Sequence, residues 1–267
     1  MSSKMNYQMT ADTRDFEKWL VKQAAVMDVG MGEVLRGEAP WLATALAKAT
    51  PPLTGKNMFS QAWGAQKKAG EGAVSKDLAK VYTTANSIYG MIAEQDEGAA
   101  KGFRRAVRRR DVGEAQRLMY VFGLSQFASS NIGEFNPDFH KQARRRHGRV
   151  GRGQRTMQIV TRGSDLNRYR REKMGRVGRL KAGWVSASRG LTKQPRWPAW
   201  LRKVARGEGT LSDQTRRRRD PYLRLTNSVR YSGSRNNSDR FVVQALVYRE
   251  RKIIRKVKGM AARKWKK

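Results

Sequence analysis

The spacing of apolar residues predicts helices over much of the chain. Apolar side chains recur every three to four residues in five stretches, a period that places them on one face of a helix. These stretches are about residues 12–28, 33–49, 86–119, 165–191 and 238–264. Within the third stretch, a new helix is expected to start at Asp111. Pro40 lies within the second stretch and is expected to kink the helix or restart it at Trp41. The last stretch is the most strongly amphipathic, because arginines and lysines cover its other faces.

Alternation of apolar and polar residues predicts fewer strands. Residues 222–231 show the clearest strand pattern, and residues 78–84 combine partial alternation with β-branched side chains. Residues 123–163 show no period and are dominated by glycine, serine, asparagine and arginine, so we expect a long loop or arm there. Within this arm, residues 157–161 are expected to form at most an isolated strand.

These elements divide the chain into a helical N-terminal region, a core and an inserted arm. The N-terminal region covers residues 1–72. Residues 73–122 and 164–267 form the core, and the Gly/Arg-rich arm of residues 123–163 is inserted in it. A chain of 267 residues is long enough for one or two domains.

The charge of the chain is concentrated in residues 101–267. The whole sequence has 57 Lys and Arg against 22 Asp and Glu, a net charge of +35. Residues 1–100 are neutral, with 11 of each sign, so the excess lies after them, where 34 of 46 cations are arginine. Arginine stays charged and donates paired hydrogen bonds to phosphate or carboxylate. The composition therefore favours an anionic partner, either nucleic acid or an acidic protein surface.

Two arginine runs supply the candidate contacts to that partner. Glycines interleave the first run, which keeps its backbone flexible and lets it approach a polyanion. The candidates are Arg144, Arg145, Arg146, Arg149, Arg152 and Arg155 in the first run, and Arg216, Arg217, Arg218 and Arg219 in the second. Three interpretations stay open: a solvated surface, an arm that docks on acidic protein, and phosphate contacts without sequence readout.

The sequence has few residues or motifs that could support catalysis, metal binding or membrane insertion. The chain has no cysteine, which excludes disulfides, zinc fingers, iron–sulfur clusters and thiol catalysis. His140 and His147 are the only histidines, and Gly55-Lys56 lacks the flanking residues of a phosphate-binding loop. No apolar run approaches the roughly 18 residues of a membrane span. We therefore expect no catalytic, cofactor or metal site and no membrane partner.

Large apolar residues are the expected packing or interface anchors. They are Trp19, Trp41, Leu180, Trp184, Trp197 and Trp200. Gly175, Gly178 and Gly183 fall within the predicted helix of residues 165–191. Because each glycine costs about 1 kcal/mol of helix propensity relative to alanine, these three indicate close packing against a neighbour.

Several short motifs, taken in order, carry a family resemblance over about residues 40–260. The motifs are Thr50-Pro-Pro-Leu-Thr-Gly55, Gly72-Ala-Val-Ser-Lys-Asp-Leu78, Val81-Tyr82, Ala99–Phe103 with Arg110-Asp111, Gly175-Arg-Val-Gly-Arg-Leu-Lys-Ala-Gly-Trp184, Trp197-Pro-Ala-Trp200 and Leu225-Thr-Asn-Ser-Val-Arg-Tyr231. The block from Leu180 to Trp184 is the strongest. In this order, ending in a basic helix, the chain resembles the neck and tail-completion proteins of tailed bacteriophages, minor virion proteins between portal and tail tube.

The resemblance implies both a fold and a role. The implied fold is α+β, with a small mixed or antiparallel sheet flanked by long amphipathic helices. The implied role is a homo-oligomeric ring, six-fold favoured, that joins head to tail in the virion and does no catalysis. Its partners would be portal, adaptor, tail-tube or terminator proteins. The main alternative is a sequence-nonspecific nucleic-acid-binding protein that uses the arginine-rich arms, and a third option is a basic subunit of a ribonucleoprotein.

Overall fold

The structure is a computed structural model in which the chain forms two compact units. It describes residues 9–10, 31–53, 58–144, 150–151, 156–217, 222–229 and 235–264. Met1–Gly70 and Arg176–Lys267 form one unit, which we call the terminal unit, and Glu71–Gly175 form the other, the insert unit. This division differs from the predicted one, because both ends of the chain share one unit and the predicted arm lies within the other.

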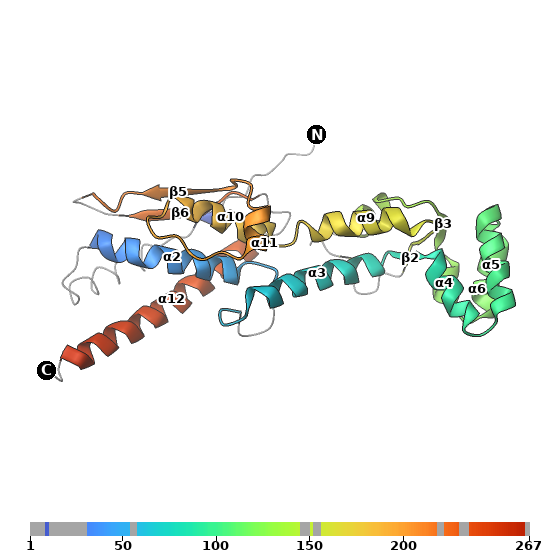
Figure 1. The fold of residues 1–267 in the computed structure, drawn as a ribbon, viewed down its shortest axis with the longest axis horizontal. Coiled ribbons are helices and arrows are strands. Elements are labelled where there is room, and N and C mark those ends of the chain that lie inside the picture. Colours follow the sequence, from blue (N-terminus) through green and yellow to red (C-terminus); the bar gives the residue numbers. More distant parts are fainter. Residues whose placement is uncertain are drawn as a thin grey trace. The chain divides into compact units, whose positions relative to one another are not determined.

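The terminal unit packs long helices against an antiparallel sheet (Figure 1). Its helices are α2 (Met31–Ala49), α10 (Arg179–Ala187), the 3-10 turn η1 (Ser188–Gly190), α11 (Ala199–Val204) and α12 (Arg235–Lys264). Its sheet has the order β1-β6-β5, formed by Met9–Thr10, Leu223–Asn227 and Gly209–Asp213 respectively. α3 (Trp63–Ala79) begins in this unit and ends in the insert unit.

The core of the terminal unit joins segments that are far apart in the sequence. Leu46 of α2, Trp184 of α10, Leu225 of β6 and Ala245 of α12 are all buried in one apolar cluster. The predicted break at Pro40 is not seen, since α2 continues through it from Met31 to Ala49. Burial of the apolar face of α2 in this cluster stabilises the helix against the cost of an internal proline.

The insert unit is built around a parallel sheet of three short strands. The strands are β2 (Tyr82–Thr84), β3 (Asn131–Gly133) and β4 (Gln158–Val160), and their order is β2-β4-β3. The helices are α4 (Ala85–Ala93), α5 (Glu97–Arg109), α6 (Val112–Val121), α7 (Ser125–Ala128), α8 (Asp138–Ala143) and α9 (Gly163–Met174). Phe103, Met119 and Ile159 are fully buried in its larger apolar cluster.

The α+β fold class is confirmed. The described residues form two separate sheets, one antiparallel and one parallel. The predicted loop of residues 123–163 was wrong over much of its length, since it contains α7, β3, α8 and β4. The predicted isolated strand is β4, which pairs with strands on both sides. Strands of three residues are too short to show alternation, and β4 is buried throughout, so the period-two signal is lost.

Two predicted helical stretches are divided in the structure, the first of them at Asp111 as predicted and also before Asp96. Residues 86–119 form α4, α5 and α6, and the carboxylates of Asp96 and Asp111 cap the latter two by accepting hydrogen bonds from the amides of Ala99 and Glu114. Residues 165–191 form α9 and α10, because Gly178 takes a left-handed backbone conformation with φ of 84°. The predicted helices of residues 33–49 and 238–264 correspond to α2 and α12, whereas residues 12–28 lie outside the described part.

Candidate functional site

The structure describes only three of the predicted arginine contacts. Arg144 forms an isolated antiparallel bridge with Val150 at the base of the first arginine run. Arg216 and Arg217 line a cavity of about 720 Å³ in the terminal unit, where Arg36 and Asp213 also lie. Arg145, Arg146, Arg149, Arg152, Arg155, Arg218 and Arg219 lie outside the described residues.

The predicted anchors differ in their burial. Trp184 is fully buried, and Leu180 and Trp197 are half-buried against the same cluster. Trp200 packs against Gly178, where an added Cβ would come within 2.2 Å of its ring. Trp41 is instead 60% exposed, so it does not anchor the core. Trp19 lies outside the described residues.

Three motifs of the family resemblance meet at α10 in the terminal unit. The ammonium of Lys181 donates hydrogen bonds to the carbonyl oxygens of Ala47, at 2.9 Å, and of Thr50 at the end of α2. The indole Nε1 of Trp184 donates to the Thr50 hydroxyl at 2.9 Å. These bonds supply partners for carbonyl groups that the end of a helix leaves free.

The third motif reaches α10 from β6. Asn227 is fully buried, and its side-chain nitrogen donates a hydrogen bond to the carbonyl of Leu180 at 2.7 Å. A Cβ on Gly183 would lie 1.9 Å from the amide oxygen of Asn227, so only glycine lets the strand approach this closely. The predicted close packing at Gly183 is therefore present, and it joins α10 to the sheet.

Burial changes the titration of the central lysine. The side chain of Lys181 is fully buried, and burial, with the nearby charge of Lys48, lowers its pKa to about 7. Its hydrogen bonds to helix carbonyls favour the charged form. Lys181 is thus a structural group whose protonation changes near neutral pH.

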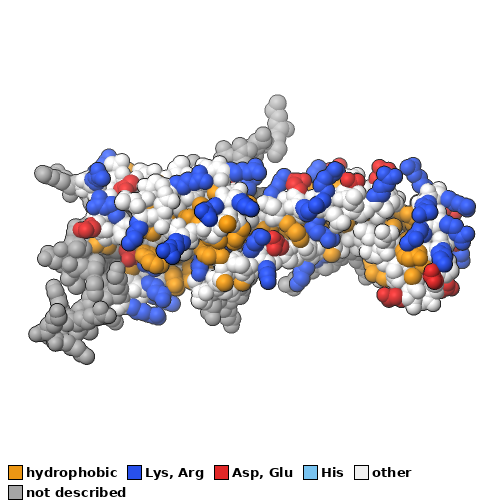
Figure 2. All heavy atoms as spheres, in the orientation of Figure 1, with side chains coloured by type: hydrophobic (Ala, Val, Ile, Leu, Met, Phe, Trp, Pro, Cys, Tyr) orange, Lys and Arg blue, Asp and Glu red, His pale blue; other side chains and the backbone are white. Residues whose placement is uncertain are grey.

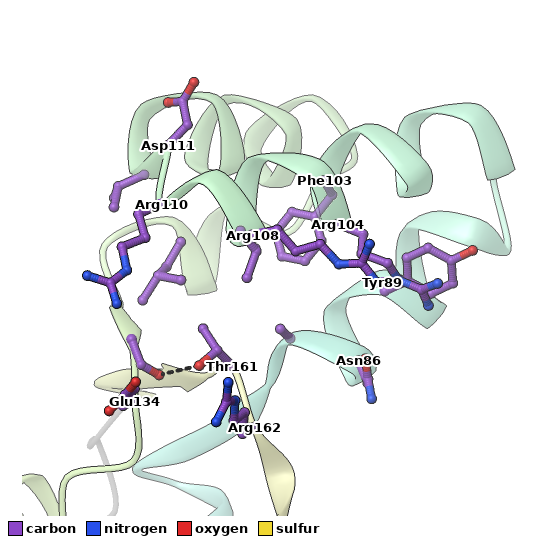
Figure 3. A pocket seen from close by; sticks show the side chains of 15 residues that line it. Asn86, Tyr89, Phe103, Arg104, Arg108, Arg110, Asp111, Glu134, Thr161 and Arg162 are labelled. Carbon is purple, nitrogen blue, oxygen red and sulfur yellow. Dashed lines mark hydrogen bonds between the residues drawn. The ribbon is translucent and has the colours of Figure 1, made fainter.

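The insert unit has a cationic cavity at one edge of its parallel sheet (Figure 3). The cavity has a volume of about 950 Å³. Its floor is formed by residues at the carboxyl ends of the three strands: Ala85 and Asn86 after β2, Gly133 at the end of β3 with Glu134 after it, and Thr161 and Arg162 after β4. Because all three strands run in one direction, their carboxyl ends lie together, which is where open α/β sheets commonly bind ligands.

Helix α5 supplies the opposite wall of the cavity. Ala100, Phe103 and Ala106 bury one face of α5, and the charged side chains of Arg104 and Arg108 lie one turn apart beside it. The guanidinium carbon of Arg104 lies 3.8 Å from the ring centroid of Tyr89. Figure 3 shows Arg104 and Arg108 facing Thr161 and Arg162 across the cavity, and Figure 2 shows cations gathered over α5.

Four arginines and two acids line this cavity. The arginines are Arg104, Arg108, Arg110 and Arg162, and the acids are Asp111 and Glu134. Within the described part of the chain, none of the four guanidinium groups forms an ion pair, although Arg104 stacks on its tyrosine. The carboxylate of Asp111 is engaged as the cap of α6. The cavity therefore offers positive charge to an anionic ligand.

A buried polar network supports the base of the first arginine run. His140 is buried, and its Nδ1 lies 3.1 Å from the hydroxyl of Tyr169, while Asp77 accepts a hydrogen bond from the Val150 amide at 3.1 Å. Burial, with the charge of Arg144, lowers the pKa of His140, and burial raises the pKa of Tyr82 to about 12. The hydrogen bond from Val150 to Asp77 and the bridge from Val150 to Arg144 hold these two residues of the run beside the buried histidine.

The cavity arginines were missed because they are scattered through the sequence. Arg108 and Arg162 are 54 positions apart, and the sheet brings their segments together. The available signals were the spacing of Arg104 and Arg108 on one helix and the position of Arg162 after the apolar run Ile159-Val160. Among the described residues, no group of three or more His, Cys, Asp or Glu side chains could hold a metal ion.

Comparison with known proteins finds no counterpart for this chain. No family model matches it, and no curated protein and no solved structure matches it either. No helix in the described ranges is long and apolar enough to cross a membrane.

Proposed function

We propose that this chain is a structural virion protein of a tailed phage, part of the neck that joins the portal and head to the tail. The observation that supports it most is the meeting of three motifs of the resemblance around α10. The Leu180–Trp184 block contacts Thr50 from one motif and Asn227 from another.

In this proposal the terminal unit is the frame of a ring subunit. Identical subunits close a ring when each presents one surface to a different surface of its neighbour. An apolar strip on α12 is suited to such a contact, since Val243 is 56% exposed and Val247, one turn later, is 38% exposed. The arginines then meet the acidic surfaces of portal or tube proteins, or DNA in the channel.

Measurement of the mass of the purified chain in solution tests this proposal. We expect a closed oligomer with one copy number over a wide range of concentration. Val243→Asp should reduce it to smaller species, whereas Val112→Asp, at an exposed valine of the insert unit, should leave the mass unchanged. A chain that remains a monomer at every concentration and coats DNA would contradict a neck role.

The second candidate is a sequence-nonspecific nucleic-acid-binding protein. The unpaired arginines of the insert cavity favour it, because phosphate contacts provide affinity without sequence readout. This function predicts tight duplex binding with a steep, linear loss of log affinity as log salt rises. Weak duplex binding whose affinity does not change with salt would exclude it.

A further inference from the structure

The cavity of the insert unit has the size and position of a small-ligand site. Its volume of about 950 Å³ lies near the upper end of the range typical of such sites, roughly 300–1,000 Å³. It opens at the carboxyl ends of β2, β3 and β4, and two helices, α4 and α9, begin at the same edge. Helix starts carry partial positive charge and free amide groups, so this edge favours an anion.

The start of α9 is available to a ligand. Thr84 caps α4 by accepting a hydrogen bond from the Ser87 amide at 3.1 Å. At α9 the capping position is held by Arg162, and no side chain caps the helix. Because Arg162 lines the cavity, the uncapped start of α9 lies at the edge of the cavity.

The backbone at Arg110 provides an independent reason to assign a role to this cavity. Arg110 has φ of 59°, and it is the one non-glycine residue in the described part of the chain with positive φ. Glycine is the usual residue at such a helix end, since a side chain there is strained. Figure 3 shows the Arg110 side chain extending from α5 toward the strand ends. A strained arginine that faces a cavity, in place of an easier glycine, is typical of a ligand site.

The stacked pair at the other end of the cavity suits a planar group. The ring of Tyr89 lies under the guanidinium of Arg104, and both line the cavity. Nucleic-acid bases stack on aromatic rings and on guanidinium planes alike. Asn86 lies at this end of the cavity, where its amide can bind amino or hydroxyl groups of a base or sugar, whereas Glu134 lies at the Arg110 end (Figure 3).

We propose that this cavity binds a nucleotide through its phosphate group, with Arg108, Arg110, Arg162 and the start of α9 as the phosphate-binding groups. The nucleotide is either free or part of a single strand of nucleic acid. The assignment goes beyond the neck role and does not depend on it, because it concerns a site within the insert unit alone. Tyr89 and Arg104 hold the base in this arrangement.

Anisotropy of a labelled short oligothymidylate tests the proposal on the full chain, with ATP and inorganic phosphate as competitors. We expect Arg108→Gln/Arg162→Gln to weaken binding about 100-fold, since each lost charge-assisted bond weakens binding about tenfold. The matched control, Arg105→Gln/Arg109→Gln, removes the same charge from exposed positions of α5 outside the cavity. It should weaken binding only a few-fold.

The competitors distinguish the two sources of the phosphate. Displacement of the oligonucleotide by ATP at micromolar concentration assigns the site to a free nucleotide. Tight oligonucleotide binding that resists ATP but depends on Arg108 and Arg162 assigns it to a strand. Equal losses of affinity in the cavity and control variants would overturn the proposal. Binding of polyglutamate, without binding of oligothymidylate, ATP or inorganic phosphate, would overturn it as well.

Arg110→Gly separates a ligand role from a structural one. Glycine accepts the backbone conformation of Arg110 without strain. The variant should therefore keep or raise the melting temperature while it weakens oligonucleotide binding about tenfold. Unchanged binding in this well-folded variant would remove Arg110 from the site and contradict the proposal.

Discussion

The two units use their cations in different ways. In the terminal unit, Lys181 is buried against the end of α2, and Arg249 of α12 forms a buried ion pair with Glu38 of α2. In the insert unit, Arg108 and Arg162 line a cavity without a carboxylate partner in the described structure. A large net charge therefore does not by itself identify a binding surface, because some of the cations belong to the core.

The difference follows from how each unit is assembled. The terminal unit brings together four chain-distant segments, so its buried cations satisfy carbonyl and carboxylate groups that would otherwise lose water. The insert unit is a parallel sheet with its strand ends open to one side, and its arginines project from helix α5 and from the strand ends around that opening.

Removal of the central tryptophan should have the largest effect on stability. Trp184 is 1% exposed and packs in the terminal core, so Trp184→Ala should reduce the free energy of unfolding by about 3–5 kcal/mol. Trp41→Ala, at the exposed tryptophan of the same unit, should cost well under about 1 kcal/mol. Denaturation by urea measures both, and equal losses would contradict the central place of α10.

Two glycine substitutions should change stability in opposite directions. Gly183→Ala forces a Cβ against the buried Asn227 and should cost about 1–3 kcal/mol. Gly37→Ala, in α2, meets nothing within 4 Å and should gain about 0.5–1 kcal/mol through helix propensity. The same urea titration measures the pair. Gly183→Ala with wild-type stability would show that β6 does not approach α10 this closely.

The buried lysine should make stability depend on alkaline pH. Because the pKa of Lys181 falls from 10.5 to about 7 on folding, the unfolded chain binds more protons between these values. The free energy of unfolding therefore rises with pH from about 7 to 10.5. We expect a shallower rise in Lys181→Met, and a wild-type curve in Lys203→Met, at an exposed lysine. Parallel curves of the free energy of unfolding against pH for wild type and Lys181→Met would contradict this prediction.

The sequence predicted the terminal unit better than the insert unit. α2, β6 and α12 are long or strongly patterned, and burial on one face gives each a readable period. The break between α9 and α10 depends on the left-handed conformation of Gly178, which a period cannot show. β3 and β4 hold three residues each, and their pairing through Gln158 and Asn131 depends on contacts far apart in the chain.

The motif around Trp184 and the cavity of the insert unit also differ in how far the sequence predicts them. The motif around Trp184 was visible because its residues are contiguous, whereas the insert cavity assembles Arg108 and Arg162 from separate elements. Composition predicts an anionic partner and places its contacts on the arginine runs. The structure adds a second candidate place, where neighbouring helices and strand ends hold arginines around one cavity.

Hydrogen–deuterium exchange on the full chain, with and without a saturating short oligothymidylate, tests the difference between the units most directly. The account predicts added protection at the start of α9 and at the junction of α5 with α6. It predicts no change in α10 or β6, where the cations are already bound to the fold. Protection concentrated in α10, or none at the cavity under conditions of tight binding, would contradict it.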